Sequence, residues 1–189
     1  MGDAKTARER VLEAAEDLFY REGVRAVGID TVIARSGVAK MSLYRNFASK
    51  DELVVAYLEE RHRRYFARWD RAVGPEDANP RARLKGLIAA TIARVREPEF
   101  RGCPFLNTSA EFPDASHPAR AVIAAHRREV RDRLLRICQA LGARSPETLT
   151  TQLMVLMDGV YSSDRRLDDD DVRAIMDATD VLIAVQTIA

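Results

Sequence analysis

Cysteines are few in this sequence, and their spacing indicates neither a cross-link nor a metal site. The chain has only Cys103 and Cys138, which stand far apart, with no Cys-x-x-Cys pair and no Cys/His cluster. Such usage argues against a disulfide scaffold or a structural zinc ion, and it is typical of a reducing compartment. We therefore predict a cytoplasmic protein with no metal and no cofactor.

Long apolar runs and enzyme motifs are absent as well. No stretch approaches the roughly 18 apolar residues that span a bilayer, and the N-terminus lacks the apolar segment of a signal peptide. The sequence has no H-E-x-x-H, no G-x-S-x-G and no glycine-rich phosphate loop, and His62, His117 and His126 have no Ser or Cys nucleophile at a telling spacing. We expect no membrane partner and no catalysis.

Alternating strand patterns are missing too, while apolar residues recur at helical spacing along most of the chain. The content of 47% hydrophobic and 31% charged residues is that of an ordinary globular protein. The fold class predicted is therefore all-α, with about nine helices separated by Gly and Pro positions. The expected helices cover residues 4–22, 30–36, 40–47, 49–73, 81–96, 102–113, 116–141, 148–162 and 172–188.

The charge is distributed unevenly, although the net charge of +1 says nothing about nucleic acid. Residues 25–50 hold five basic side chains against the single acidic Asp30, whereas residues 164–189 hold seven Asp against three Arg. A basic beginning and an acidic end indicate one part that faces DNA and another held away from it.

Residues 28–47 have the pattern of two short helices joined by a tight turn. Asp30 is the expected N-cap of the first helix, and Ser36-Gly37 ends it, because glycine tolerates the positive φ of a sharp turn. In the second helix Leu43 and Phe47 lie four apart on one apolar side. This is the pattern of a helix-turn-helix, which lays its second helix in the DNA major groove; a plain helical hairpin with a solvated basic face is the alternative.

The stretch from Val38 to Leu53, VAKMSLYRNFASKDEL, closely resembles the signature of the TetR family of transcriptional regulators. There the motif runs Gly-Val-Ser/Ala-Lys-x-Thr/Ser-Leu-Tyr-x-His/Asn-Phe-x-Ser-Lys-Glu/Asp-x-Leu. Met41 replaces the commoner Gly and Asn46 the commoner His. The resemblance implies a DNA-binding domain at residues 1–50 and an effector-binding and dimerisation domain at residues 51–189. It also implies a homodimeric repressor that places one recognition helix per subunit in successive major grooves of a near-palindromic operator on double-stranded DNA.

The side chains expected on the DNA face follow from the motif. Lys50 and Tyr44 are expected to clamp phosphate, as the resemblance implies, and Thr31 to touch another phosphate. Arg45 and Asn46 are suited to base edges, since Arg pairs with guanine and Asn with adenine. The complete set is Thr31, Lys40, Met41, Ser42, Tyr44, Arg45, Asn46 and Lys50.

The helical body is less informative. The resemblance implies a pocket for a small, largely apolar effector, although the same aromatic residues and methionines would equally fill a helical core. Regulation by a protein partner through the same body is the alternative function. The candidate pocket residues are Phe66, Trp69, Phe105, Asn107, Phe112, His126, Met154, Met157, Asp158 and Tyr161.

The last two expected helices carry more apolar surface than a monomer would need to cover one side of them. In TetR-like proteins such helices pair with their copies in a four-helix dimer interface, and packing within one chain is the alternative. The candidates are Leu153, Val160, Ile175, Leu182 and Ile183.

Overall fold

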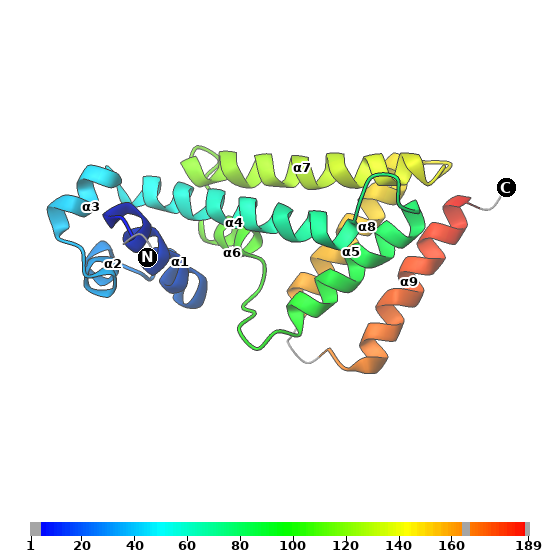
Figure 1. Cartoon of the computed structure of the whole chain (residues 1–189), viewed down its shortest axis with the longest axis horizontal. Coiled ribbons are helices and arrows are strands. Elements are labelled where there is room, and N and C mark those ends of the chain that lie inside the picture. The colour runs from blue at the N-terminus through cyan, green and yellow to red at the C-terminus, as the bar shows by residue number, and fades with distance from the viewer. Residues whose placement is uncertain (1–4, 164–166, 188–189) are drawn as a thin grey trace. The chain divides into compact units, whose positions relative to one another are not determined.

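The computed structural model describes residues 5–163 and 167–187 of the chain. Over these residues it contains nine α-helices and no strand, so the predicted all-α class is confirmed (Figure 1). The helices are α1 Ala7–Glu22, α2 Ile29–Ser36, α3 Lys40–Asn46, α4 Lys50–Val73, α5 Pro80–Val95, α6 Pro104–Glu111, α7 Pro118–Ala140, α8 Pro146–Ser162 and α9 Asp169–Thr187. Ala4 and Ile188, where the first and last helices were expected to begin and end, lie outside the described residues, as do residues 164–166 of the acidic end.

Side-chain caps explain where α1 and α4 begin. The Thr6 hydroxyl accepts the Glu9 amide at 3.2 Å, and the Glu9 carboxylate accepts the Thr6 amide at 2.7 Å, which is a complete capping box. At α4 the Ser49 hydroxyl accepts the Glu52 amide at 3.1 Å, whereas the Glu52 carboxylate accepts the amide of Ala48 at 2.7 Å. These bonds satisfy amides that the first turn of a helix leaves without a partner.

The predicted N-cap role of Asp30 is wrong. Helix α2 begins at Ile29 with Gly28 as its N-cap, so Asp30 stands inside the first turn. There the positive end of the helix dipole stabilises the Asp30 carboxylate. The carboxylate also forms an ion pair with Lys40, the first residue of α3.

The chain divides into two compact units. The head unit contains residues 1–63 and 103–125, and the body unit contains residues 64–102 and 126–189. Helices α4 and α7 each contribute residues to both units. The boundary of packing therefore lies further along the chain than the boundary at residue 50 that we predict from the motif.

The head unit is built around the apolar sides of α1, α3 and the first half of α4. Val11, Leu43 and Leu53, one from each helix, have no exposed side-chain surface. The Phe19 ring meets the Tyr57 ring edge to face with 5.7 Å between centroids. This core fixes the backs of α2 and α3 and leaves their other sides in solvent.

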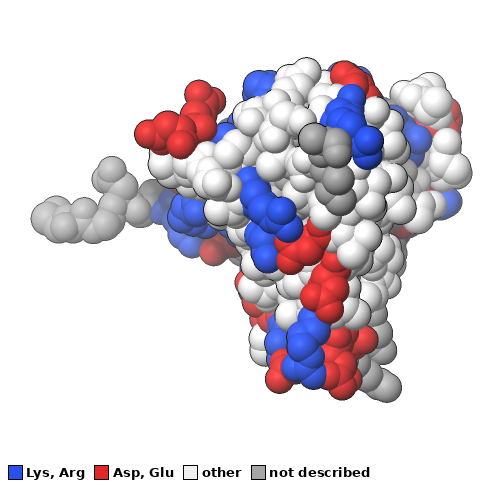
Figure 2. All heavy atoms as spheres, turned by 90° about the vertical axis from the view of Figure 1, so that its right-hand side faces the viewer, with Lys and Arg blue, Asp and Glu red and all other residues white. Residues whose placement is uncertain are grey.

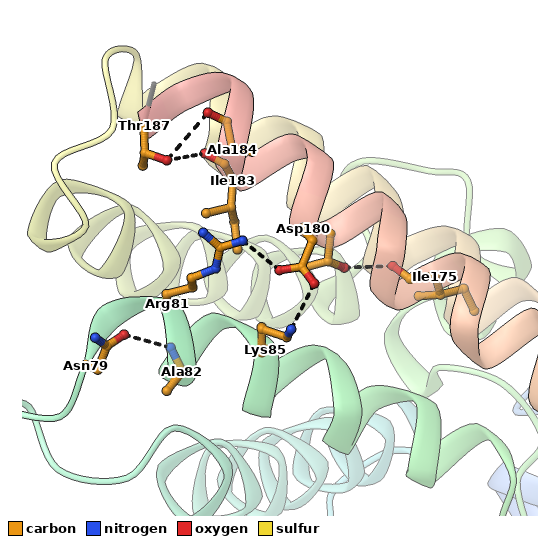
Figure 3. A network of polar contacts seen from close by, with 10 residues as sticks. Asn79, Arg81, Ala82, Lys85, Ile175, Asp180, Ile183, Ala184 and Thr187 are labelled. Carbon is orange, nitrogen blue, oxygen red and sulfur yellow. Dashed lines mark hydrogen bonds and ion pairs between the residues drawn. The ribbon is translucent and has the colours of Figure 1, made fainter. Parts of the chain in front are cut away.

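In the body unit α5, α8 and α9 lie side by side (Figure 1). Asp180 of α9 ties this helix to α5: its two carboxylate oxygens accept hydrogen bonds from Lys85 at 2.8 Å and Arg81 at 2.9 Å (Figure 3). These hydrogen bonds from Lys85 and Arg81 hold the pKa of the Asp180 carboxyl below its ordinary value. In the same network the Asn79 side chain accepts the Ala82 amide and begins α5.

Candidate functional site

The turn between α2 and α3 is fixed by α1. Gly37 has a φ of +62° and donates its amide to the Ile33 carbonyl at 3.0 Å, which ends α2 in a left-handed cap. The Nη2 atom of Arg10 donates hydrogen bonds to the carbonyls of both Ser36 and Gly37, at 2.8 Å each. Since Arg10 belongs to α1, this pair of bonds sets the turn, and with it the direction in which α3 leaves α2.

The rotation of α3 is set by two buried side chains. Leu43 is fully buried and Phe47, the residue after the helix, is 1% exposed. The guanidinium of Arg8 covers the Phe47 ring at 5.1 Å from its centroid. The opposite side of α3 is consequently open to solvent, with Met41 67% exposed and Tyr44 42% exposed.

The structure brings the predicted DNA-binding residues to this open side and the two ends of it. Thr31, Lys40, Met41, Tyr44 and Arg45 are exposed, while Ser42, Asn46 and Lys50 are half-buried.

Two of these side chains already have partners. The Asn46 Nδ2 donates to the Ser42 carbonyl at 2.8 Å, so its amide is bonded within α3. The Lys40 Nζ donates to Asp30 at 3.1 Å, and this hydrogen bond raises the pKa of Lys40. Burial lowers the pKa of Lys50, against the attraction of nearby carboxylates. Asn46 and Lys40 thus each form a side-chain hydrogen bond. Within residues 5–163 and 167–187, the Arg45 side chain forms no such bond.

One contact of the head unit has no signal in the local sequence pattern. The carboxylate of Glu111, at the end of α6, accepts the amide of Val24 at 3.1 Å and that of Arg25 at 2.6 Å. The Arg25 side chain returns a bond to the Glu111 carbonyl at 3.4 Å. Helix α6 is thereby attached to the loop that leads into α2. We call this arrangement the α6 latch.

The ten predicted pocket residues divide between the units. Phe105, Asn107 and Phe112 belong to the head unit and the other seven to the body unit. Four of those seven, Phe66, Trp69, Met154 and Met157, belong to the body core. The buried His126 ring packs edge to face on Tyr65 at 4.7 Å between centroids. Asp158 forms an ion pair with Arg127 at 2.9 Å.

A cavity of about 330 Å³ does lie in the body unit, and we call it the body cavity. It shares Trp69 and Tyr161 with the predicted pocket. The remaining side chains come mainly from α4 and α5 and include arginines that the prediction missed. Its lining residues are Tyr65, Arg68, Trp69, Arg71, Ala72, Leu87, Ala90, Thr91, Ala93, Arg94, Glu97 and Tyr161.

The predicted dimer residues lie mostly inside the body. Leu153, Val160 and Ile183 are at most 4% exposed and belong to the body core, so they have almost no surface left for a second chain. Ile175 and Leu182 are half-buried against the same core.

The open sides of α8 and α9 are occupied by other residues. Val155 of α8 is 64% exposed, and Val181 and Val185 of α9 are 60% and 53% exposed. From Thr148 to Ser162 the exposed positions of α8 carry no charged side chain. Figure 2 views the molecule from the right-hand side of Figure 1: uncharged surface covers much of the face, and a band of charged side chains runs from its middle to its lower end.

Among the residues described, no group of three or more His, Cys, Asp or Glu is arranged to hold a metal ion. Over the same residues no helix combines the length and the apolarity needed to cross a membrane.

A helix-turn-helix with an exposed basic recognition helix, joined to a separate helical unit, defines the class of helix-turn-helix transcriptional regulators. The family model of the bacterial regulatory proteins of the tetR family matches residues 11–57, and that of the tetracyclin repressor-like C-terminal domain matches residues 80–178. The chain belongs to the TetR family, as its sequence motif predicted, and it is a DNA-binding regulator rather than an enzyme.

Solved structures of the family are similar over more than nine tenths of the chain. A TetR-family regulator from Streptomyces coelicolor has 30% identity and a TM-score of 0.88, covering 96% of each chain. A regulator of the family from Streptomyces avermitilis has 32% identity and a TM-score of 0.78, covering 93% of this chain and 99% of that one. The transcriptional repressor KstR2 of Mycobacterium tuberculosis is 34% identical over 94 residues, which are 50% of this chain and 46% of that protein. The chain thus spans about half the length of the curated relatives it matches.

Proposed function

We propose that the protein is a homodimeric repressor that binds a near-palindromic operator in the cytoplasm and is released from it by a small effector bound in the body unit. The observation that carries the DNA-binding part is the orientation of α3. Its apolar side is anchored by Leu43 and Phe47, and its open side presents Met41, Tyr44 and Arg45. In this orientation Arg45 is the best candidate to read a base, since its guanidinium can donate two bonds to guanine.

The dimer is proposed from the open side of α8, whose exposed positions from Thr148 to Ser162 are uncharged, and from the exposed Val181 and Val185 near the end of α9. A helix that faces water normally carries charged residues there, whereas this one presents Val155, with Val181 and Val185 on the neighbouring helix. A second copy of the same chain would cover the surface through an isologous, two-fold interface. Gly159, one turn after Val155, would allow the two α8 helices to approach closely.

The oligomeric state can be tested by sedimentation. Val181→Asp should convert a dimer into a monomer at micromolar concentration, because it would bury an unpaired carboxylate in the interface. Ala89→Asp is the matched control, since Ala89 is exposed on α5 and lies outside the proposed interface. A Val181→Asp variant that stays dimeric would refute this interface.

Operator recognition can be tested by selecting bound DNA from a random duplex library at two salt concentrations. We expect an inverted repeat whose half-sites are separated by about one helical turn of 10–10.5 base pairs or a multiple of it. Lys50→Ala should weaken binding to all sequences alike and reduce the salt dependence, as expected for a phosphate contact. Binding that is steeply salt-sensitive and selects no sequence would reduce the surface of α3 to a phosphate clamp and refute the operator proposal.

A further inference from the structure

The body cavity combines an apolar interior with a cationic rim. Trp69 and Leu87, from α4 and α5, are 3% and 4% exposed and form part of its deep wall. The rings of Tyr65 and Tyr161 add aromatic surface. A cavity of about 330 Å³ is at the small end of the range for ligand pockets, about 300–1,000 Å³.

Guanidinium groups dominate the charge around this apolar wall. Arg68 and Arg71 of α4 and Arg94 of α5 line the cavity together with a single carboxylate, that of Glu97. Arg94 and Glu97 form an ion pair with each other, so their charges largely cancel. Arg68 and Arg71 stand three residues apart on α4, and this spacing places them on the same side of the helix. Both are exposed, which puts their charge at the mouth of the cavity.

The charged hydrogen-bond donors around the cavity are therefore guanidinium groups, and Tyr65 and Tyr161 add hydroxyl groups to the lining. The Thr91 hydroxyl, which is buried in the same wall, donates to the Leu87 carbonyl at 2.9 Å. A neutral apolar compound would use the wall and ignore the arginines. An apolar compound with an anionic head would use both, because a guanidinium offers a fork of donors that matches a carboxylate.

We propose that the body cavity binds a small compound with an apolar body and a carboxylate head, the head being held by Arg71. This inference rests on the effector-responsive function proposed above, and it deepens that function by naming the chemical class of the effector.

Trp69 gives a direct measurement, since it is the only tryptophan of the chain and lies in the cavity wall. The probes are cyclohexylbutyrate and its uncharged amide, which share one apolar body and do not absorb where tryptophan is excited. We expect the carboxylate to change Trp69 fluorescence at a concentration on the order of tenfold lower than the amide does, as a charged hydrogen bond would give. Inorganic phosphate, which has charge without an apolar body, should leave the fluorescence unchanged.

Variants locate the head group. Arg71→Ala should weaken carboxylate binding by on the order of tenfold and leave amide binding as it was. Arg71→Lys should restore part of the loss, because it keeps the charge and loses the fork. Arg128→Ala is the matched control, an exposed arginine of α7 that does not line the cavity, and should bind as the unmodified protein does.

The outcomes separate the ligand class from the regulatory function. Equal affinity for acid and amide, no fluorescence change with either, or an Arg71→Ala variant that binds the acid normally would each overturn the carboxylate proposal. Selective binding of the acid supports it. If that binding leaves the affinity for the selected operator unchanged, the carboxylate site stands and the effector-release function proposed above fails.

Discussion

Gly86 is the position where a single methyl group should disturb the packing of the body unit. It lies inside α5, and a Cβ built on it would stand 2.6 Å from the backbone carbonyl oxygen of Ala72, near the end of α4. Real Cβ atoms do not approach an oxygen so closely, and the oxygen belongs to a backbone that cannot rotate away as a side chain would. Gly86→Ala should therefore push the end of α4 away from α5.

The magnitude follows from two opposed effects. Replacing Gly by Ala inside a helix favours folding by about 1 kcal/mol. Overpacking a close contact costs about 1–3 kcal/mol, and the backbone partner places this case toward the upper end. We expect Gly86→Ala to lower the free energy of unfolding by about 1–2 kcal/mol net. In a chain of this size each kcal/mol corresponds to about 2–4 °C in the melting midpoint.

Gly159 provides the matched control, because a Cβ there would have no atom within 4 Å. Gly159→Ala should raise the free energy of unfolding by about 1 kcal/mol from helix propensity alone. Both substitutions should be made in a Val181→Asp background, so that the proposed dimer face does not enter the comparison. Urea unfolding gives the free energies. A Gly86→Ala variant as stable as its parent would show that α4 and α5 yield at this contact, and would refute the reasoning.

Three further predictions concern single side chains. Arg45→Ala should relax discrimination at one operator position by about 1–3 kcal/mol. Asn46→Ala should cost less, because the Asn46 side-chain amide is already bonded to the Ser42 carbonyl. Titration of operator variants measures both losses, and a larger effect of Asn46→Ala would reverse the assignment of the base-reading residue. Asp180→Asn should destabilise the protein at neutral pH. Since the folded-state pKa of Asp180 lies below the ordinary 3.8, its stabilisation is complete above that value and is lost as the pH falls through the folded pKa. Unfolding curves of the two proteins should therefore converge in acid, and a difference independent of pH would contradict the ion pairs as its source. Glu111→Ala should reduce the free energy of unfolding by about 1–3 kcal/mol and accelerate hydrogen exchange at the Val24 amide, which loses its acceptor; unchanged exchange there would show that the α6 latch is not formed in solution.

The head could be predicted from the sequence because its signals are local. The turn at Ser36-Gly37 and the spacing of Leu43 and Phe47 each depend on residues close in the chain, and the structure shows both as expected. The prediction of the N-cap of α2 was wrong because Gly28 and Asp30 are both acceptable N-cap residues. The ion pair of Asp30 with Lys40 is a tertiary contact, which a local sequence pattern does not reveal.

Contacts that join distant segments could not be predicted in this way. Glu111 and Val24 are 87 residues apart, and nothing in the spacing of either segment indicates their hydrogen bond. The body shows a second limit. Periodicity identifies which side of a helix is apolar but not what covers it. The sequence therefore predicts Leu153 and Ile183 on a dimer face, whereas the chain's own core covers them.

The body cavity also shows that a pattern of apolar residues does not reveal how they pack. The sequence predicts large apolar residues such as Met157 around the effector. Large apolar residues fill space, however, and a hollow forms where side chains are small or point outward. Ala72 and Ala90 in the wall, and arginines such as Arg71 at the mouth, fit that requirement. A sequence search for pockets in helical bodies should therefore look for small residues beside charged ones at helical spacing.

Helix α4 contributes residues both to the head unit and to the body cavity, so the proposed regulation makes a thermodynamic prediction. Its first residues, from Lys50, belong to the head unit, and its later residues, including Trp69 and Arg71, line the body cavity. In the effector-release function proposed above, a carboxylate bound at the cavity displaces α4 and changes the packing of the residues that continue it. Such coupling is reciprocal: if the carboxylate weakens operator binding by some factor, the operator must weaken carboxylate binding by the same factor. Titrating Trp69 fluorescence with cyclohexylbutyrate in the presence and absence of saturating operator measures the second factor, and gel-shift titration measures the first. Two equal factors above one establish the coupling, whereas unequal factors would mean that the two assays follow different sites.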